Sequence, residues 1–369
     1  MSRMNLCNNI SDGWNYSGCL LTLYLLPLVC ILGLLLNIAC LAVFILHRKH
    51  PIVPALISLS ICDSLQLFFS LFVLYIPALH QFSGSEFSSR LGQISFISTG
   101  LFGPVLLTAN CSSIWTMCYI CIKRYRVISN PLSSLTDKNS NWKILICITI
   151  VAFLFNFRKW LEYEWKWIDL QTTEDILYKQ QNYDPNRKWF LAYEYKKFIH
   201  NVNYRIIWEI VVYPVCVYLI PCLLILVLHG RILKSMRERQ IESVGHKRRL
   251  AQEKRSAMLL IAIVIMFFIC HTGGLIVRLF DFSKYQTVSW FIFMKDTANF
   301  LFNVNSCANP MVYFIFTRHF KDLHSTWSST KLKNKQQKLA SKELKNLLIK
   351  NSSTSATQQN HYDGEKKGI

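Results

Sequence analysis

Long runs of apolar side chains, separated by shorter polar segments, dominate the chain as far as about residue 316. A helix that crosses the hydrocarbon core of a bilayer needs about 20 mostly apolar residues. The runs lie at about Leu20–Leu46, Ile52–Leu79, Phe96–Ile122, Ile144–Phe157, Glu209–Leu228, Met258–Phe280 and Val288–Phe316. The pattern therefore predicts an all-α bundle of seven transmembrane helices.

The polar segments between the runs indicate how the chain is oriented. Four basic residues, 47–50, follow the first run, and nine Lys and Arg lie in the predicted inner loop at about 229–257. Because positive residues gather on the cytoplasmic side, we expect a multi-pass protein of the plasma membrane with residues 1–19 outside. Asn9 and Asn15 begin N-x-S sequons there and are candidate glycosylation sites.

Two further segments have their own character. Residues 161–205 are polar, aromatic and mixed in charge, which predicts a long outer loop or a small folded lid. An amphipathic eighth helix is expected after the seventh run, which ends a receptor-like domain at 20–325. Residues 326–369 are rich in Lys, Ser, Asn and Gln, and we expect a disordered cytoplasmic tail. Its hydroxyl cluster at 352–357 is either an arrestin-docking site once phosphorylated or simply part of a soluble tail.

Composition narrows the class of protein. Hydrophobic residues make up 52% of the 369 residues and charged residues only 17%, whereas soluble domains carry about a quarter. The net charge of +20 would suit nucleic acid, but much of it flanks the apolar runs, so we expect membrane lipid as the partner and no nucleic acid. The runs hold no paired carboxylates or metal-ligand set, so the protein is not expected to be an enzyme. Without an inverted repeat, a transporter is disfavoured too.

Cysteine usage separates two residues from the rest. The chain has 13 cysteines, and only Cys7 and Cys19 lie outside the apolar runs. Cysteines inside such runs mostly act as small hydrophobic residues. No CxxC pair with a histidine partner predicts a zinc site, and no organic cofactor is expected.

Two motifs carry a family resemblance. Asn309, Pro310 and Tyr313 form NPxxY near the inner end of the seventh run, where the proline kinks the helix. Arg124 and Tyr125 close the third run, with a Pro-Leu pair ending at Leu132 beyond them.

The two motifs resemble the NPxxY and DRY motifs of rhodopsin-like G-protein-coupled receptors. The resemblance implies that Arg124, Leu132 and Tyr313 carry a signal to a heterotrimeric G protein. Lys123 stands where the family usually has an acid, which implies a different inactive-state latch or raised basal activity.

Asp63 in the second run is a candidate for a sodium site. The resemblance places the other ligands of such a site at Ser113, Asn305, Ser306 and Asn309. A hard cation prefers oxygen ligands, and an isolated buried carboxylate needs a cation or a proton. The alternative is a protonated Asp63 within a hydrogen-bond network.

The sixth and third runs depart from the family pattern. His271 replaces the tryptophan of the CWxP motif, and this Cys-His-Thr sequence resembles FMRFamide-like neuropeptide receptors of invertebrates. His271 is then an activation switch or, alternatively, a core histidine. Thr99 stands where the family has a cysteine bridged to the second outer loop, and 161–205 contain no cysteine. That loop must be held by its own packing.

Charged and aromatic residues gather at the outer ends of the predicted helices, where polar residues within a bundle often face a cavity. This opening suits a peptide, with Glu209 or Asp296 pairing with a basic residue of the ligand. The alternative is that these residues only mark helix ends exposed to solvent. A chemosensory receptor for a small molecule has the same architecture and stays open as an alternative. The candidate ligand-binding residues are Glu209, Asp296, Arg278, Trp208, Trp290 and Tyr75.

Overall fold

The structure is a computed structural model, and it describes residues 7, 12–46, 52–85, 89–129, 142–169, 189–196, 201–242, 247–280 and 288–316. The predicted eighth helix, the tail at 326–369, Asn9 and Leu132 lie outside these residues.

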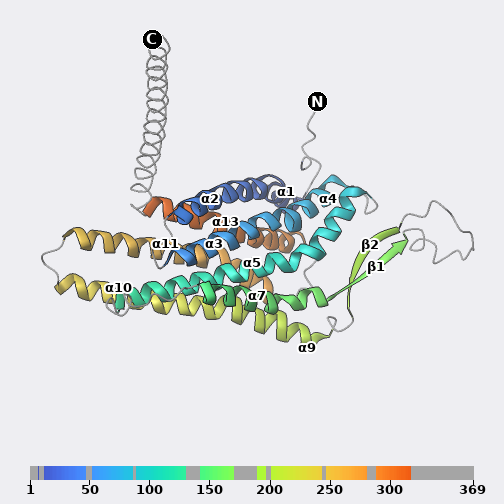
Figure 1. Ribbon diagram of the computed structural model, residues 1–369. Coiled ribbons are helices and arrows are strands. Elements are labelled where there is room, and N and C mark those ends of the chain that lie inside the picture. Colours follow the sequence, from blue (N-terminus) through green and yellow to red (C-terminus); the bar gives the residue numbers. More distant parts are fainter. Residues whose placement is uncertain are drawn as a thin grey trace, which may run out of the picture. The chain divides into compact units, whose positions relative to one another are not determined.

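The described residues form seven long helical segments, here called spans one to seven (Figure 1). Three of the spans contain short π-helical stretches, labelled η. Span one consists of α1 (Gly13–Leu20), η1 (Leu21–Leu25) and α2 (Leu26–Leu46), and span two of α3 (Val53–Ser70), η2 (Leu71–Tyr75) and α4 (Ile76–Ser83). Span three is α5 (Arg90–Ser129), span four is α7 (Trp142–Leu161), and span five consists of α9 (Val202–Arg205), η5 (Ile206–Val212), η6 (Val215–Leu219) and α10 (Ile220–Glu242). Span six is α11 (Lys247–Leu279), and span seven is α13 (Ser289–Phe316).

Hydropathy distinguishes the spans from one another. Among the described residues, spans one to five are long and apolar enough to cross a membrane, and α11 contains the shorter apolar stretch Val264–Leu279. The seventh span carries Lys295, Asp296 and several asparagines, which lower its hydropathy. Many of those asparagines are buried, Asn303, Asn305 and Asn309 among them, as expected for polar groups that face a bundle interior.

The spans pack in an order that brings distant parts of the chain together. Span one packs against spans two and seven, α5 packs against spans two, four and five, and α11 packs against α13. Gly33 permits one of these approaches, because a Cβ there would lie 2.7 Å from Leu67 and 3.1 Å from the Cβ of Cys307. The first, second and seventh spans therefore meet closely at one glycine.

The helices extend beyond the predicted bilayer-length runs. The predicted inner loop at 229–257 is mostly helical, because α10 continues to Glu242 and α11 already begins at Lys247. Arg, Lys, Glu and Gln favour helix, so leaving the apolar region does not end either helix. The outer segment 1–19 likewise contains α1, which starts at Gly13 with Asp12 as its N-cap; the Asp12 carboxylate accepts a hydrogen bond from the Trp14 amide at 3.1 Å.

The predicted outer loop at 161–205 contains a small folded element. Strands β1 (Tyr163–Asp169) and β2 (Trp189–Tyr195) form an antiparallel pair, with Tyr163 opposite Tyr195 and Trp165 opposite Tyr193. Aromatic residues favour paired strands. This two-stranded hairpin is an exception to the all-α prediction within the described residues, and it supports the alternative of a folded lid.

Candidate functional site

The inner end of α5 presents the arginine of the predicted switch. Arg124 is half-buried, and its Nη1 is buried without a hydrogen-bond partner among the described residues. The Lys123 ammonium lies 5.8 Å from the centroid of the Tyr119 ring, a cation–π distance. Lys123, which stands where the family usually has an acid, thus has an aromatic neighbour one turn back.

His229 of α10 faces the same region. Its Nδ1 lies 2.7 Å from the Ile225 carbonyl oxygen, whereas its Nε2 is buried without a partner among the described atoms. If Nδ1 carries the proton and donates, Nε2 offers a lone pair. Arg124 and His229 therefore each carry a buried ring or guanidinium nitrogen without a partner among the described residues.

Asp63 is the centre of a buried polar cluster. It is fully buried in α3, where Ser113 Oγ donates to its Oδ1 at 2.6 Å and Asn309 Nδ2 donates to its Oδ2 at 2.8 Å. Ser306 and Asn305 of α13 are buried as well. The structure therefore brings together spans two, three and seven, as the resemblance predicted.

The cluster partly fits a sodium ion. The Ser306 hydroxyl lies close enough to Asp63 to interact with its carboxylate, but its buried Oγ does not reach hydrogen-bond geometry with any described residue. Asp63, Ser113 and Ser306 thus offer the oxygen ligands that a hard cation prefers. Asn309 turns its amide nitrogen toward the carboxylate, so it acts as a donor rather than as a ligand. Tyr313 belongs to α13, but the structure describes only its backbone.

His271 packs as an aromatic ring in the core of α11. Its centroid lies 4.4 Å from that of Phe267 and 5.1 Å from that of Phe302, and neither ring nitrogen has a partner among the described residues. Gly274, one turn outward, admits the Phe302 ring, because a Cβ there would lie 2.2 Å from Phe302 Cζ. The sixth and seventh spans interlock around His271, which occupies the position of the family's tryptophan.

A cluster of ion pairs joins spans four, five and six at their outer ends. The Glu209 carboxylate forms three ion pairs, with nitrogen–oxygen distances of 2.5 Å to Lys159, 3.1 Å to Arg278 and 3.3 Å to Arg158. Glu162 pairs with Lys159 at 2.9 Å and also with Arg158. These side chains are 2–22% exposed, so water screens them only in part.

Aromatic rings cover the cations of this cluster. The Arg278 guanidinium lies 4.1 Å from the centroid of Tyr213, and that of Arg158 lies 4.8 Å from the centroid of Trp208. Three of the predicted ligand residues, Glu209, Arg278 and Trp208, are therefore engaged within the protein. A ligand that contacts Glu209 has to compete with three resident cations.

The hairpin is seated on α5 by aromatic packing. The Phe96 and Tyr193 rings lie 4.4 Å apart, and a Cβ on Gly100 would come within 2.8 Å of Trp165 and 2.9 Å of Tyr193. Burial raises the pKa of Tyr193 to about 12, so this ring stays neutral at physiological pH. The seat flanks Thr99, which the sequence identified as the site of the missing cysteine.

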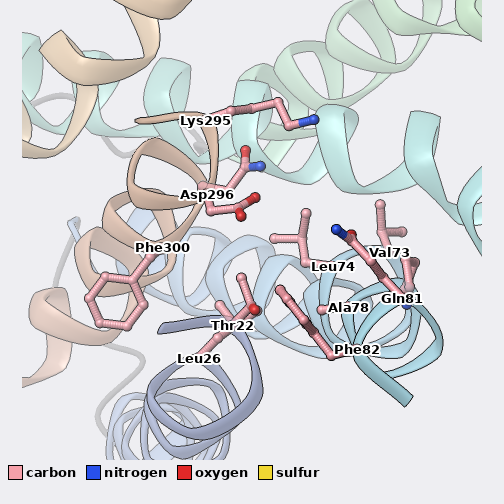
Figure 2. Close-up of a pocket in the computed structure, with 12 residues that line it drawn as sticks. Thr22, Leu26, Val73, Leu74, Ala78, Gln81, Phe82, Lys295, Asp296 and Phe300 are labelled. Atoms are coloured by element: carbon pink, nitrogen blue, oxygen red, sulfur yellow. The ribbon is translucent and has the colours of Figure 1, made fainter. Parts of the chain in front are cut away.

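The remaining candidates lie away from this cluster. Asp296 lines a cavity of about 170 Å³ between spans one, two and seven, shown in Figure 2. Tyr75 packs beside that region, whereas Trp290 packs against Phe291 on α13. The predicted ligand residues thus form separate groups rather than one site.

The glycosylation candidate Asn15 lies on α1. Its Nδ2 donates to Asp12 at 3.2 Å and to the Ser289 hydroxyl at 3.4 Å.

Sequence reasoning missed a disulfide between Cys7 and Cys19. The two sulfurs pack with Leu23 and with Ala78 of α4. The available signal was that these two cysteines alone lie outside the apolar runs, on the side predicted to be extracellular, where disulfides form and persist.

Comparisons with known proteins agree with this architecture. The profile of the family described as "7 transmembrane receptor (rhodopsin family)" matches residues 36–313. A FMRFamide receptor of Drosophila melanogaster is 25% identical over 307 residues, which are 80% of this chain and 52% of that receptor. The chain thus spans about half the length of this relative.

Two other groups of relatives match at similar levels. A B1 bradykinin receptor of Tupaia minor is 25% identical over 330 residues, 85% of this chain and 84% of that protein. A proteinase-activated receptor 2 of Rattus norvegicus is 23% identical over 309 residues, 80% of this chain and 68% of its own.

Proposed function

Because the chain belongs to the rhodopsin family of seven-transmembrane receptors, we propose that it binds an extracellular peptide and signals through a heterotrimeric G protein. The observation that carries the proposal is the family match over residues 36–313, on a fold that gathers Asp63, Ser113 and Asn309 in the bundle core. An outside ligand then shifts the bundle toward a state whose inner face is open.

The unsatisfied Arg124 guanidinium supports the inner half of the proposal. A planar, permanently charged group with several donors suits a contact that exchanges partners. Its Nη1 is buried and has no partner within the described residues, so a carbonyl or carboxylate of a G protein would meet a donor without a partner once the inner face opens. A sodium ion held by Asp63, Ser113 and Ser306 would add positive charge between spans two, three and seven, and so favour one packing of those spans over another.

The relatives and the outer residues support a peptide ligand. The matched proteins are described as FMRFamide and bradykinin receptors, and the sequence Cys270-His271-Thr272 resembles the FMRFamide-like group. We propose an amidated peptide that carries a basic residue beside aromatic ones. The hairpin and its α5 seat would form one wall of the entrance.

The test is G-protein activation in cells that express the receptor. A library of amidated neuropeptides, FMRFamide included, should contain a member that activates wild type in a saturable manner, with the Arg124→Ala variant as the non-signalling control. Activation by small odorants and by no peptide would favour the chemosensory alternative. If neither class activates the receptor at normal surface expression, the proposed function fails.

Orientation is proposed from the same charge pattern. An epitope tag placed before Leu20 should stain intact cells, because the basic segments at 47–50 and 229–257 belong inside. Staining only after permeabilisation would reverse the orientation.

Docking of arrestin on a phosphorylated 352–357 segment is a further proposal. Deletion of the tail after Lys350 should then slow desensitisation.

A further inference from the structure

The cavity between spans one, two and seven contains a carboxylate that forms no ion pair among the described residues. Asp296 projects into it, and within the described residues its oxygens have no hydrogen bond and no ion pair. A partly buried charge is costly unless it is paired. Figure 2 shows the carboxylate directed toward the cavity, whereas Lys295 extends along the rim, where its side chain is exposed.

Apart from Lys295, whose exposed side chain lies at the rim, the walls of the cavity are apolar or neutral. Leu26, Leu74 and Phe300 line one part, and Gln81 contributes a neutral amide. Asp296 Oδ2 lies 3.6 Å from where a Cβ on Gly18 would be, so the acid lies against α1. The site therefore offers one acid inside a slot of apolar and neutral walls, with one exposed cation, Lys295, at its rim.

The extracellular disulfide forms the outer side of this site. Cys7 and Cys19 pack with Leu23 on Ala78 and Phe82, and the last two also line the cavity. The ring of Trp14 contacts that of Phe293 at 5.5 Å, which docks α1 on α13. Disulfide and helix together keep span one in place beside the acid.

We propose that this cavity is a cation site, in which Asp296 pairs with the guanidinium or primary ammonium of a basic ligand residue while the methylene stem packs on Leu26, Leu74 and Phe300. The volume of about 170 Å³ exceeds the engineered cavity of about 150 Å³ that accepts benzene, so the end of an Arg or Lys side chain fits. This deepens the proposed function, since it names the acid that meets the basic residue of the peptide.

Glu209, the other acid proposed to meet a basic ligand residue, is already paired with cations of the protein. Glu209 is held by Lys159, Arg158 and Arg278, and that cluster of three cations and two acids has a net positive charge. A second cation would be repelled there, whereas at Asp296 the neighbouring cation, Lys295, is exposed to solvent and forms no ion pair with the acid among the described residues. The structure thus favours the side of spans one, two and seven for the basic group of a ligand.

The site can be tested without any signalling measurement. Purified receptor in detergent micelles is titrated with n-butylguanidinium and with n-butylurea, its neutral counterpart of similar shape, and binding is followed by saturation-transfer NMR. Butylguanidinium should bind and butylurea should bind at least about tenfold more weakly. Asp296→Asn should weaken butylguanidinium by at least about tenfold, Asp296→Glu should retain it, and Glu194→Gln on the exposed hairpin should match wild type.

A second measurement covers the case in which a variant folds poorly. In a Val73→Cys variant, which keeps Asp296 and places a thiol in the cavity lining, a cationic methanethiosulfonate reagent should label residue 73, and butylguanidinium should slow that labelling at least about threefold, whereas butylurea should not. Equal binding of the two probes, undiminished binding in Asp296→Asn, or no binding to wild type would overturn the site. If the cation binds but no peptide signals, the site stands and the peptide proposal fails.

Discussion

Replacing Glu209 by Gln should destabilise the outer half of the bundle. The substitution keeps the shape of the side chain but removes one of two acids from a cluster that holds three cations. Glu162 continues to pair with Arg158 and Lys159. Among the described residues Arg278 forms an ion pair with Glu209 alone, so it loses its counter-ion and keeps neutral contacts such as the Tyr213 ring.

The expected magnitude follows from burial. Removing one partner of a buried ion pair costs about 3–5 kcal/mol, because the other charge is left uncompensated. Glu209 and Arg278 are 22% and 21% exposed, so partial hydration reduces the loss to about 2 kcal/mol. For a chain of a few hundred residues, each kcal/mol shifts the melting temperature by about 2–4 °C, so we expect a fall of about 5 °C.

The assay is thermal unfolding of purified receptor in detergent, monitored by a thiol-reactive dye, since most of the described cysteines are buried. Glu194→Gln is the matched control, because its pair with Lys166 is 45–60% exposed and should leave the melting temperature unchanged. Glu209→Gln combined with Arg278→Gln should regain part of the loss, because the orphaned charge is gone. An unchanged melting temperature in Glu209→Gln, or a double variant less stable than both single ones, would refute this account of the cluster.

Three further predictions concern the core and the inner end. Asp63→Asn should alter the agonist response or its sodium dependence at normal surface expression, and identical responses at every sodium concentration would contradict it. Lys123→Asp should lower ligand-free second-messenger output by supplying the missing acid, whereas Arg124→Ala should abolish agonist-driven output; an unchanged basal level points to another latch. Gly274→Ala should lower the melting temperature by an amount equivalent to about 1–3 kcal/mol, because the new Cβ meets Phe302 at 2.2 Å; Gly273→Ala, with 3.9 Å to its nearest neighbour, is the control.

Much of the fold was predictable because bilayer thickness sets a length scale that apolar runs must match. All seven predicted runs lie within or overlap the observed spans. The helix ends were not predictable on the same basis. Residues 229–242 are polar but consist largely of good helix formers, so α10 continues where hydropathy marked a loop.

The core of the candidate site was also predictable, and its outer half was not. The resemblance to the receptor family placed Ser113 and Asn309 beside Asp63, and in the structure both donate hydrogen bonds to its carboxylate. Whether an outer acid is free depends on which cations fold against it. Glu209 and Asp296 look alike in the sequence, yet three cations hold the first and none pairs with the second within the described residues.

The length of α11 has a mechanical consequence. From Gly274, against which Phe302 packs, the helix runs inward to Lys247, a distance of about 40 Å at 1.5 Å per residue. If the helix pivots as a stiff lever at this interlock, a tilt of about 10° displaces its tip at Lys247 by about 7 Å. A movement too small to disturb the outer packing is thereby amplified into an opening wide enough to admit a side chain or the end of a helix.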